Sequence, residues 1–70
     1  MYTMDQEELS DIAGIIISLN NLDLYEMWIK IQHEFSSENV IDIFFFLCEN
    51  NKIDDLIKSK RFYDDKFRDI

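Results

Sequence analysis

The side chains that could carry catalytic or metal chemistry are few. The 70-residue chain has one histidine, His33, and one cysteine, Cys48. A zinc site needs three or four ligands, and a His–Cys pair without a third orienting group lacks the parts of a nucleophilic centre. We therefore interpret Cys48 as a small, buried apolar side chain.

The adjacent carboxylates do not supply the missing chemistry. Asp54 and Asp55, like Asp64 and Asp65, are neighbours in sequence. Neighbours on a helix point about 100° apart, so the two groups of such a pair cannot share a proton or hold one magnesium ion. A single glycine also excludes a glycine-rich phosphate loop, and no segment has the alternating oxygen ligands around a central glycine that a calcium loop needs. We expect a protein that is not an enzyme and uses no cofactor or metal.

The charge of the chain is strongly acidic and unevenly distributed. Fifteen acids against seven bases give a net charge of −8. Residues 1–51 contain ten acids and one base, Lys30, whereas residues 52–70 contain five acids and six bases. This balance argues against direct binding to nucleic acid or to anionic lipid. The acidic body is either a solvated surface or a face that docks on a basic partner.

The length and the apolar segments limit the class of protein. Seventy residues, 47% of them hydrophobic, are enough for a single small domain over residues 1–70. The longest apolar run covers residues 43–48, far short of the ~18–20 residues of a membrane span, and the first residues have no basic signal segment. One cysteine cannot form an internal disulfide. We expect a cytoplasmic protein, of the producing cell or of an infected host.

Pairs of polar residues divide the chain at intervals of about 15 residues, which suits short helices with short connections. They are Asn20-Asn21, Ser36-Ser37 and Asn50-Asn51. Asparagine tolerates the left-handed conformation that ends a helix, and serine or asparagine caps the free N–H groups of the next one. The pattern predicts an all-α fold, a compact bundle of four to five short antiparallel helices.

The first expected helix covers residues 4–19. Thr3 and Gln6 form a plausible capping box at its start. Gly14 either permits close approach of a neighbouring helix or is simply tolerated. The buried stripe is predicted at Leu9, Ile12, Ala13, Ile16 and Leu19.

The second expected helix runs from residue 22 or 23 to residue 33 or 35. Its apolar stripe is predicted at Leu24, Met27, Trp28, Ile31 and Phe35. Tyr25 and Ile29 lie beside that stripe and widen the apolar face. A face this broad indicates either a central position or a surface for a partner.

The third expected helix starts after Ser36-Ser37 and is so apolar that we expect it to be the core element, packed on most sides. Glu38, Asp42 and Glu49 mark its narrow outer edge, and Phe45 beside them is the best candidate for an exposed aromatic. Residues 52–70 form one helix, or two hinged near Ser59. They are supported by the pairs Asp54–Lys58 and Asp64–Arg68.

Residues 22–57 resemble death-fold modules. The segments that carry the resemblance are Leu22-Asp23-Leu24-Tyr25, Phe35-Ser36-Ser37-Glu38-Asn39-Val40 and Lys52-Ile53-Asp54-Asp55-Leu56-Ile57. They are similar to the later helices of death-effector and bacterial effector-associated domains. The departure is that Lys52 stands one position before the basic slot of the family's final helix, which Ile53 occupies here. The resemblance implies a non-catalytic module that acts through homotypic helix-surface contacts.

Three functions remain open. The first is a small acidic helical interaction module or adaptor that self-associates to a homo-oligomer. The second is a phage- or virus-encoded acidic inhibitor, a nucleic-acid mimic that blocks a basic groove, whose affinity would fall steeply with salt. The third is a regulatory subunit that folds fully only on its partner. The candidate partner-binding residues are Glu38, Asp42, Phe45, Glu49, Tyr25 and Ile29.

Overall fold

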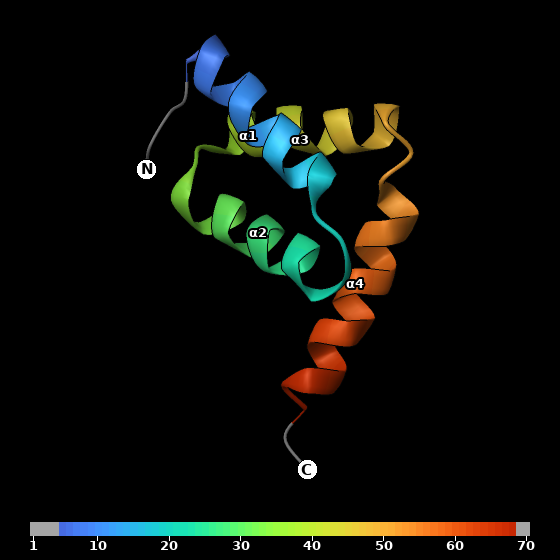
Figure 1. Cartoon of the computed structure of the whole chain (residues 1–70). Coiled ribbons are helices and arrows are strands. Elements are labelled where there is room, and N and C mark those ends of the chain that lie inside the picture. Colours follow the sequence, from blue (N-terminus) through green and yellow to red (C-terminus); the bar gives the residue numbers. More distant parts are fainter. Residues whose placement is uncertain (1–4, 69–70) are drawn as a thin grey trace.

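A computed structural model describes residues 5–68, and these residues form four α-helices. The helices are α1 (Gln6–Ser18), α2 (Asn21–Glu34), α3 (Ser37–Glu49) and α4 (Ile53–Lys66) (Figure 1). The prediction of an all-α fold is therefore confirmed. The last segment, for which one helix or two were open, forms a single helix over its described length, with no hinge at Ser59.

The start of α1 differs from the prediction. The helix begins at Gln6, and Asp5 caps it, because its Oδ1 accepts a hydrogen bond from the Glu8 N–H at 2.8 Å. Thr3, which we expected to cap this helix, lies outside the described residues. The carboxylate of Asp5 also places negative charge at the positive end of the helix dipole.

The polar pairs serve the next two helices in different ways. Ser36 caps α3 as predicted, since its Oγ accepts a hydrogen bond from the Asn39 N–H at 3.4 Å. Asn20 precedes α2 without a side-chain cap bond. Its Oδ1 instead accepts a hydrogen bond from Lys52 Nζ at 3.0 Å. The α1–α2 connection is thereby tied to the residue that precedes α4.

Asn51 ends α3 in the left-handed conformation, with φ of 57°. Its N–H donates to the Cys48 carbonyl at 3.2 Å, and the next N–H, of Lys52, donates to the Leu47 carbonyl at 2.9 Å. These two bonds form a Schellman motif, which satisfies carbonyls at the end of the helix and turns the chain sharply. The predicted left-handed helix end is confirmed, whereas asparagine does not cap the next helix, because the N-cap residue of α4 is Lys52 and it makes no side-chain cap bond.

The buried apolar side chains form one cluster to which all four helices contribute. They are Ala13, Ile16, Leu24, Ile31, Ile43, Leu47 and Leu56. The stripes predicted for the first two helices are confirmed, although several of their members are only partly buried. α2 packs most extensively on α4, and α1 packs on α3 and α2.

The prediction that the third helix is covered on most sides is wrong. Only Asn39, Ile43 and Leu47 of α3 are buried. Cys48 is exposed, which also corrects its interpretation as a buried residue. A short chain with four helices has too few elements to cover a helix all round, so the apolar residues of α3 extend onto its solvent side.

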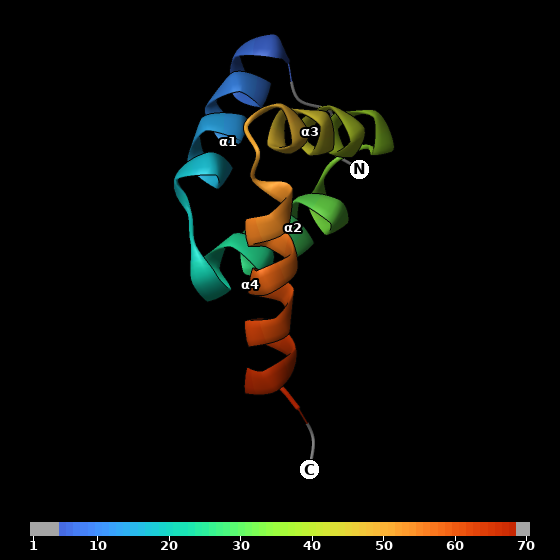
Figure 2. The same ribbon diagram turned by 90° about the vertical axis from the view of Figure 1, so that its right-hand side faces the viewer.

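The helices cross one another instead of lying side by side. In both views α4 runs vertically and α3 runs across it (Figure 1, Figure 2). The predicted antiparallel packing is therefore not confirmed. The C-terminal half of α4 projects beyond the other helices, and the molecule measures 41 × 26 × 15 Å along its principal axes.

Candidate functional site

Four of the six predicted partner-binding residues share one side of α3. Glu38, Asp42, Phe45 and Glu49 are spaced at i, i+4, i+7 and i+11, which places them in a line about 16 Å long on one side of the helix. All four are exposed, and the Phe45 side chain is 59% exposed. The prediction that Phe45 is an exposed aromatic is confirmed.

Three further exposed side chains lie beside this line. Ile41 is 52% exposed, Phe44 is 40% exposed, and Cys48 is exposed as well. The surface formed by Glu38, Ile41, Asp42, Phe44, Phe45, Cys48 and Glu49 is called the α3 outer face below. Sequence reasoning missed these three residues. Ile41 and Cys48 lie on the side of the helix away from the buried Ile43 and Leu47, whereas Phe44 lies between the two sides.

Trp28 extends the apolar part of this surface onto α2. Its ring centroid lies 6.1 Å from that of Phe44, with the two ring planes tilted by 42°. Trp28 is half-buried and belongs to the layer packed against the core. Phe44 therefore rests on a fixed aromatic neighbour, which restricts its rotamers and makes the outer face a preformed surface.

The carboxylates of the α3 outer face have no cation beside them. Among residues 5–68, the ion pairs are Lys52–Asp55, Lys60–Asp64 and Arg68–Asp65, and all of them belong to α4 or its flanks. The predicted pairs Asp54–Lys58 and Asp64–Arg68 do not form. The acidic edge of α3 is therefore solvated and free to meet an outside cation.

The two remaining predicted residues lie elsewhere. The Tyr25 ring packs edge-on against that of Tyr63 in α4, with a centroid distance of 5.0 Å. Ile29 follows Tyr25 by one helical turn and is also half-buried. Tyr25 is therefore used in the α2–α4 contact, and the predicted set of six residues is divided between two sides of the molecule.

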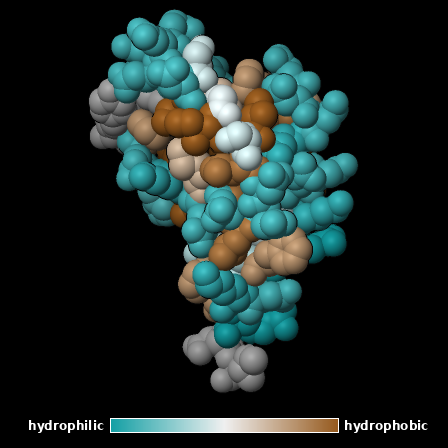
Figure 3. Space-filling view, in the orientation of Figure 1, coloured by the Kyte–Doolittle hydropathy of each residue, from teal (hydrophilic) through white to brown (hydrophobic). Residues whose placement is uncertain are grey.

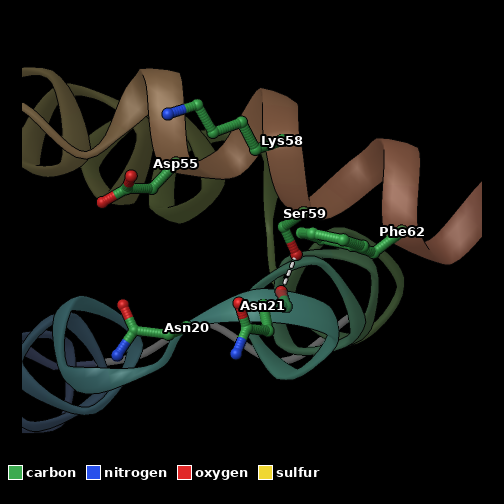
Figure 4. A pocket seen from close by; sticks show the side chains of 6 residues that line it. All are labelled: Asn20, Asn21, Asp55, Lys58, Ser59 and Phe62. Carbon is green, nitrogen blue, oxygen red and sulfur yellow. Dashed lines mark hydrogen bonds between the residues drawn. The ribbon is translucent and has the colours of Figure 1, made fainter.

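A second feature of interest is Ser59, whose side chain is completely buried. Its hydroxyl donates a hydrogen bond to the Asn21 carbonyl and accepts one from the Tyr25 N–H at 2.8 Å. Figure 4 shows Ser59 pointing from α4 to the first turn of α2. Because neither bond connects Ser59 to a base, this serine is a structural link between helices and not a nucleophile.

The hollow beside Ser59 has a volume of about 90 Å³. It is lined by Asn20, Asn21, Asp55, Lys58, Ser59 and Phe62 (Figure 4). Over the described part of the chain, no three side chains from His, Cys, Asp and Glu come together as metal ligands would. The α3 outer face instead combines exposed aromatic side chains with carboxylates that form no ion pair in residues 5–68, and it is the candidate docking surface.

Apolar surface is also visible in the orientation of Figure 1. Figure 3 shows brown side chains over the upper part of the molecule, where α1 crosses α3, and a smaller group where α4 passes the start of α2. Teal polar side chains separate the two groups. Exposed apolar residues therefore occur on more than one surface of the described part of the chain.

No family model matches this chain, and no curated protein and no solved structure is significantly similar to it. None of the helices between residues 5 and 68 combines the length and the apolar character needed to cross a bilayer. The function has to be argued from the geometry of the surface itself.

Proposed function

We propose that this chain is a small, acidic, non-catalytic helical interaction module that docks on other proteins through the α3 outer face. The observation that carries the proposal is the combination of exposed Phe45, at 59%, with three carboxylates that form no ion pair in residues 5–68. The partner is a protein with an apolar strip bordered by lysine or arginine. The resemblance to death-fold modules supports the same class of function.

The aromatic residues supply the affinity and the carboxylates supply the orientation. A phenylalanine that is buried in full removes about 150–250 Å² from water. The exposed fractions of Ile41, Phe44 and Phe45 therefore leave on the order of 300 Å² of apolar surface for a partner. This lies in the range of the largest patch of a typical monomer, about 300–600 Å². Docking on this surface alone is a weak, reversible interaction.

Flanking charges act mainly on the rate and specificity of docking. Exposed carboxylates attract a basic partner and repel an acidic one over a Debye length, about 8 Å at physiological salt. Mutating Glu38, Asp42 and Glu49 to neutral amides would then slow association without removing the apolar contact. Truncating Phe45 would instead speed dissociation.

The nucleic-acid mimic is the weaker hypothesis, because the acids of α3 are sparse. Over the roughly 16 Å from Glu38 to Glu49 the outer face carries three carboxylates, whereas one strand of DNA carries a phosphate about every 3.4 Å. Phe45 also stands between Asp42 and Glu49, where a mimic needs charge. An aromatic residue within an acidic line is better suited to a mixed apolar and charged protein interface.

Photo-crosslinking in the producing cell tests the proposal. Phe45 is replaced by a photoreactive phenylalanine analogue, and the matched control carries the same analogue at Ile15 of α1, which is 48% exposed. We expect a protein adduct at position 45 that is absent at position 15 and is lost when Asp42→Lys is added. Equal adducts at both positions would mean that α3 is an ordinary exposed surface.

A further inference from the structure

The exposed side of α4 complements the α3 outer face. Ile57 is 49% exposed and Phe62 is 55% exposed. Lys58 and Arg61 lie between them on the helix and are exposed as well. These four residues are called the α4 outer face below. Ile57 and Arg61 lie away from Leu56, Ser59 and Tyr63, which α4 turns toward the core and α2, whereas Lys58 and Phe62 are exposed at the rim of the hollow beside Ser59.

The cations of the α4 outer face are available for a partner. The other basic side chains of α4 and its flanks are engaged: Lys52, Lys60 and Arg68 form ion pairs, and Lys66 lies over the Phe67 ring. Lys58 and Arg61 form no ion pair in the described part of the chain. Asp54 lies one turn before Lys58 on the same side of the helix, and Asp65, which pairs with Arg68, lies one turn after Arg61. The basic character is therefore confined to Lys58 and Arg61.

We propose that the partner of the α3 outer face is a second copy of this chain, which presents its α4 outer face. This inference rests on the proposed function and names its partner. In such a contact the two cations of the α4 outer face would lie against the three carboxylates of the α3 outer face. Ile57 and Phe62 would pack on the apolar side chains of α3. The two faces do not pair with each other inside one chain, since no ion pair of residues 5–68 joins α3 to α4.

The arrangement of the helices permits this contact between copies. The C-terminal half of α4 projects past the other helices in both views, so a neighbour can reach its exposed side without meeting the rest of the bundle (Figure 1, Figure 2). A symmetric pairing of two α3 outer faces would instead gather six carboxylates and no cation, which like-charge repulsion opposes. The expected contact is heterologous: one copy contributes its α3 outer face and the other its α4 outer face. Each copy therefore retains one unused face.

Sedimentation velocity over a concentration series tests the proposal with the full chain and two variants. Asp42→Lys with Phe45→Ser disables the α3 outer face, and Arg61→Glu with Phe62→Ser disables the α4 outer face. We expect the unmodified chain to associate weakly, and each variant alone to associate at least tenfold more weakly. An equimolar mixture should regain association, because it contains one intact face of each kind. Lys30→Glu, an exposed cation on α2, is the matched charge control and should behave like the unmodified chain.

Each alternative gives a distinct result. Association of the α4 variant alone would overturn the inference in favour of an α3–α3 contact, and a mixture that stays monomeric would overturn it as well. Circular dichroism of each variant confirms that the helices are retained, since all four substituted residues are exposed. A chain that is monomeric at every concentration, but whose position 45 crosslinks a different protein, refutes the second copy and leaves the proposed function intact. If the chain neither self-associates nor crosslinks a protein from position 45, both the second copy as partner and the proposed function are refuted.

Discussion

Removing the Ser59 hydroxyl should destabilise the fold by a measurable amount. Ser59 lies completely buried in α4, and its Oγ sits between the Asn21 carbonyl and the Tyr25 N–H. Ser59→Ala removes both bonds while leaving the helix propensity of α4 slightly improved. The perturbation is therefore confined to the link between α4 and the first turn of α2.

The size of the effect follows from what the two backbone groups can do afterwards. A buried polar group without a partner costs about 1–3 kcal/mol, so two such groups set an upper limit of roughly 2–6 kcal/mol. Asn21 and Tyr25 are, however, four residues apart, the spacing of the direct α-helical bond. If the first turn of α2 tightens, they can bond to each other and recover part of the loss. We therefore expect Ser59→Ala to lower the free energy of unfolding by about 1–3 kcal/mol.

Urea denaturation monitored by circular dichroism measures this change, and hydrogen exchange of the Tyr25 amide locates it. A chain of this size has a total stability of about 3–5 kcal/mol, so the expected loss is a large fraction. The matched control is Ser18→Ala, because the exposed Ser18 hydroxyl donates a single bond to the Ile15 carbonyl. That substitution should stay within about 0.5 kcal/mol of the unmodified chain.

Equal urea midpoints for Ser59→Ala and Ser18→Ala would show that the two hydrogen bonds of Ser59 do not stabilise the fold. A loss without faster exchange at Tyr25 would show that the cost comes from the small void and not from the hydrogen bonds. A loss near the upper limit would mean that the first turn of α2 cannot close on itself. The three outcomes separate the possible roles of the hydroxyl.

Three further predictions concern local features. Gly14→Ala should raise the free energy of unfolding by about 1 kcal/mol in urea denaturation, because a Cβ at this position meets no atom within 4 Å; a loss would mean that another copy approaches closely there. Asn51 has a φ of 57°, a left-handed conformation that glycine adopts freely and alanine does not. Asn51→Gly should therefore leave the melting temperature unchanged or raise it. Asn51→Ala should lower it, because the strained backbone costs about 1 kcal/mol of unfolding free energy. The Asp64 carboxylate, which accepts a hydrogen bond from Lys60, raises the pKa of Lys60. Asp64→Asn should lower the pKa of Lys60 in an NMR titration. The Lys60–Asp64 pair contributes little to stability. That contribution is present below the ordinary lysine pKa and is lost as the pH rises through the raised pKa of Lys60.

The ends of the helices could be predicted from the sequence because caps are local. Ser36 caps its own helix, and Asn51 adopts the left-handed conformation through its own side-chain preference. The start of α1 was missed by two residues, since Thr3 and Asp5 are both acceptable caps and only the packed helix distinguishes them. Local rules thus located the breaks between helices and left their exact ends uncertain by about one turn.

The exposed edge of α3 at Phe45 could be predicted, but the exposure of Phe44 and Cys48 could not, because burial depends on which helices arrive from elsewhere in the chain. The run from Ile43 to Cys48 is almost wholly apolar, and hydrophobic content alone indicates a core helix. The helices cross instead of surrounding α3, so Ile43 and Leu47 are buried while Phe44, Phe45 and Cys48 are not. The link from Ser59 to α2 was invisible for the same reason, since it joins residues more than 30 positions apart.

Salt dependence cannot decide between the proposed contacts, because two electrostatic terms oppose each other. Each copy has a net charge of −8, so association of two copies is opposed by a long-range repulsion that added salt screens. The local attraction of Lys58 and Arg61 for the carboxylates of α3 is screened at the same time. A weak response to salt is thus compatible with a mixed contact and does not identify a purely apolar one. Complementation between the α3 and α4 variants is free of this ambiguity, because both single-variant samples and their mixture are compared at one ionic strength.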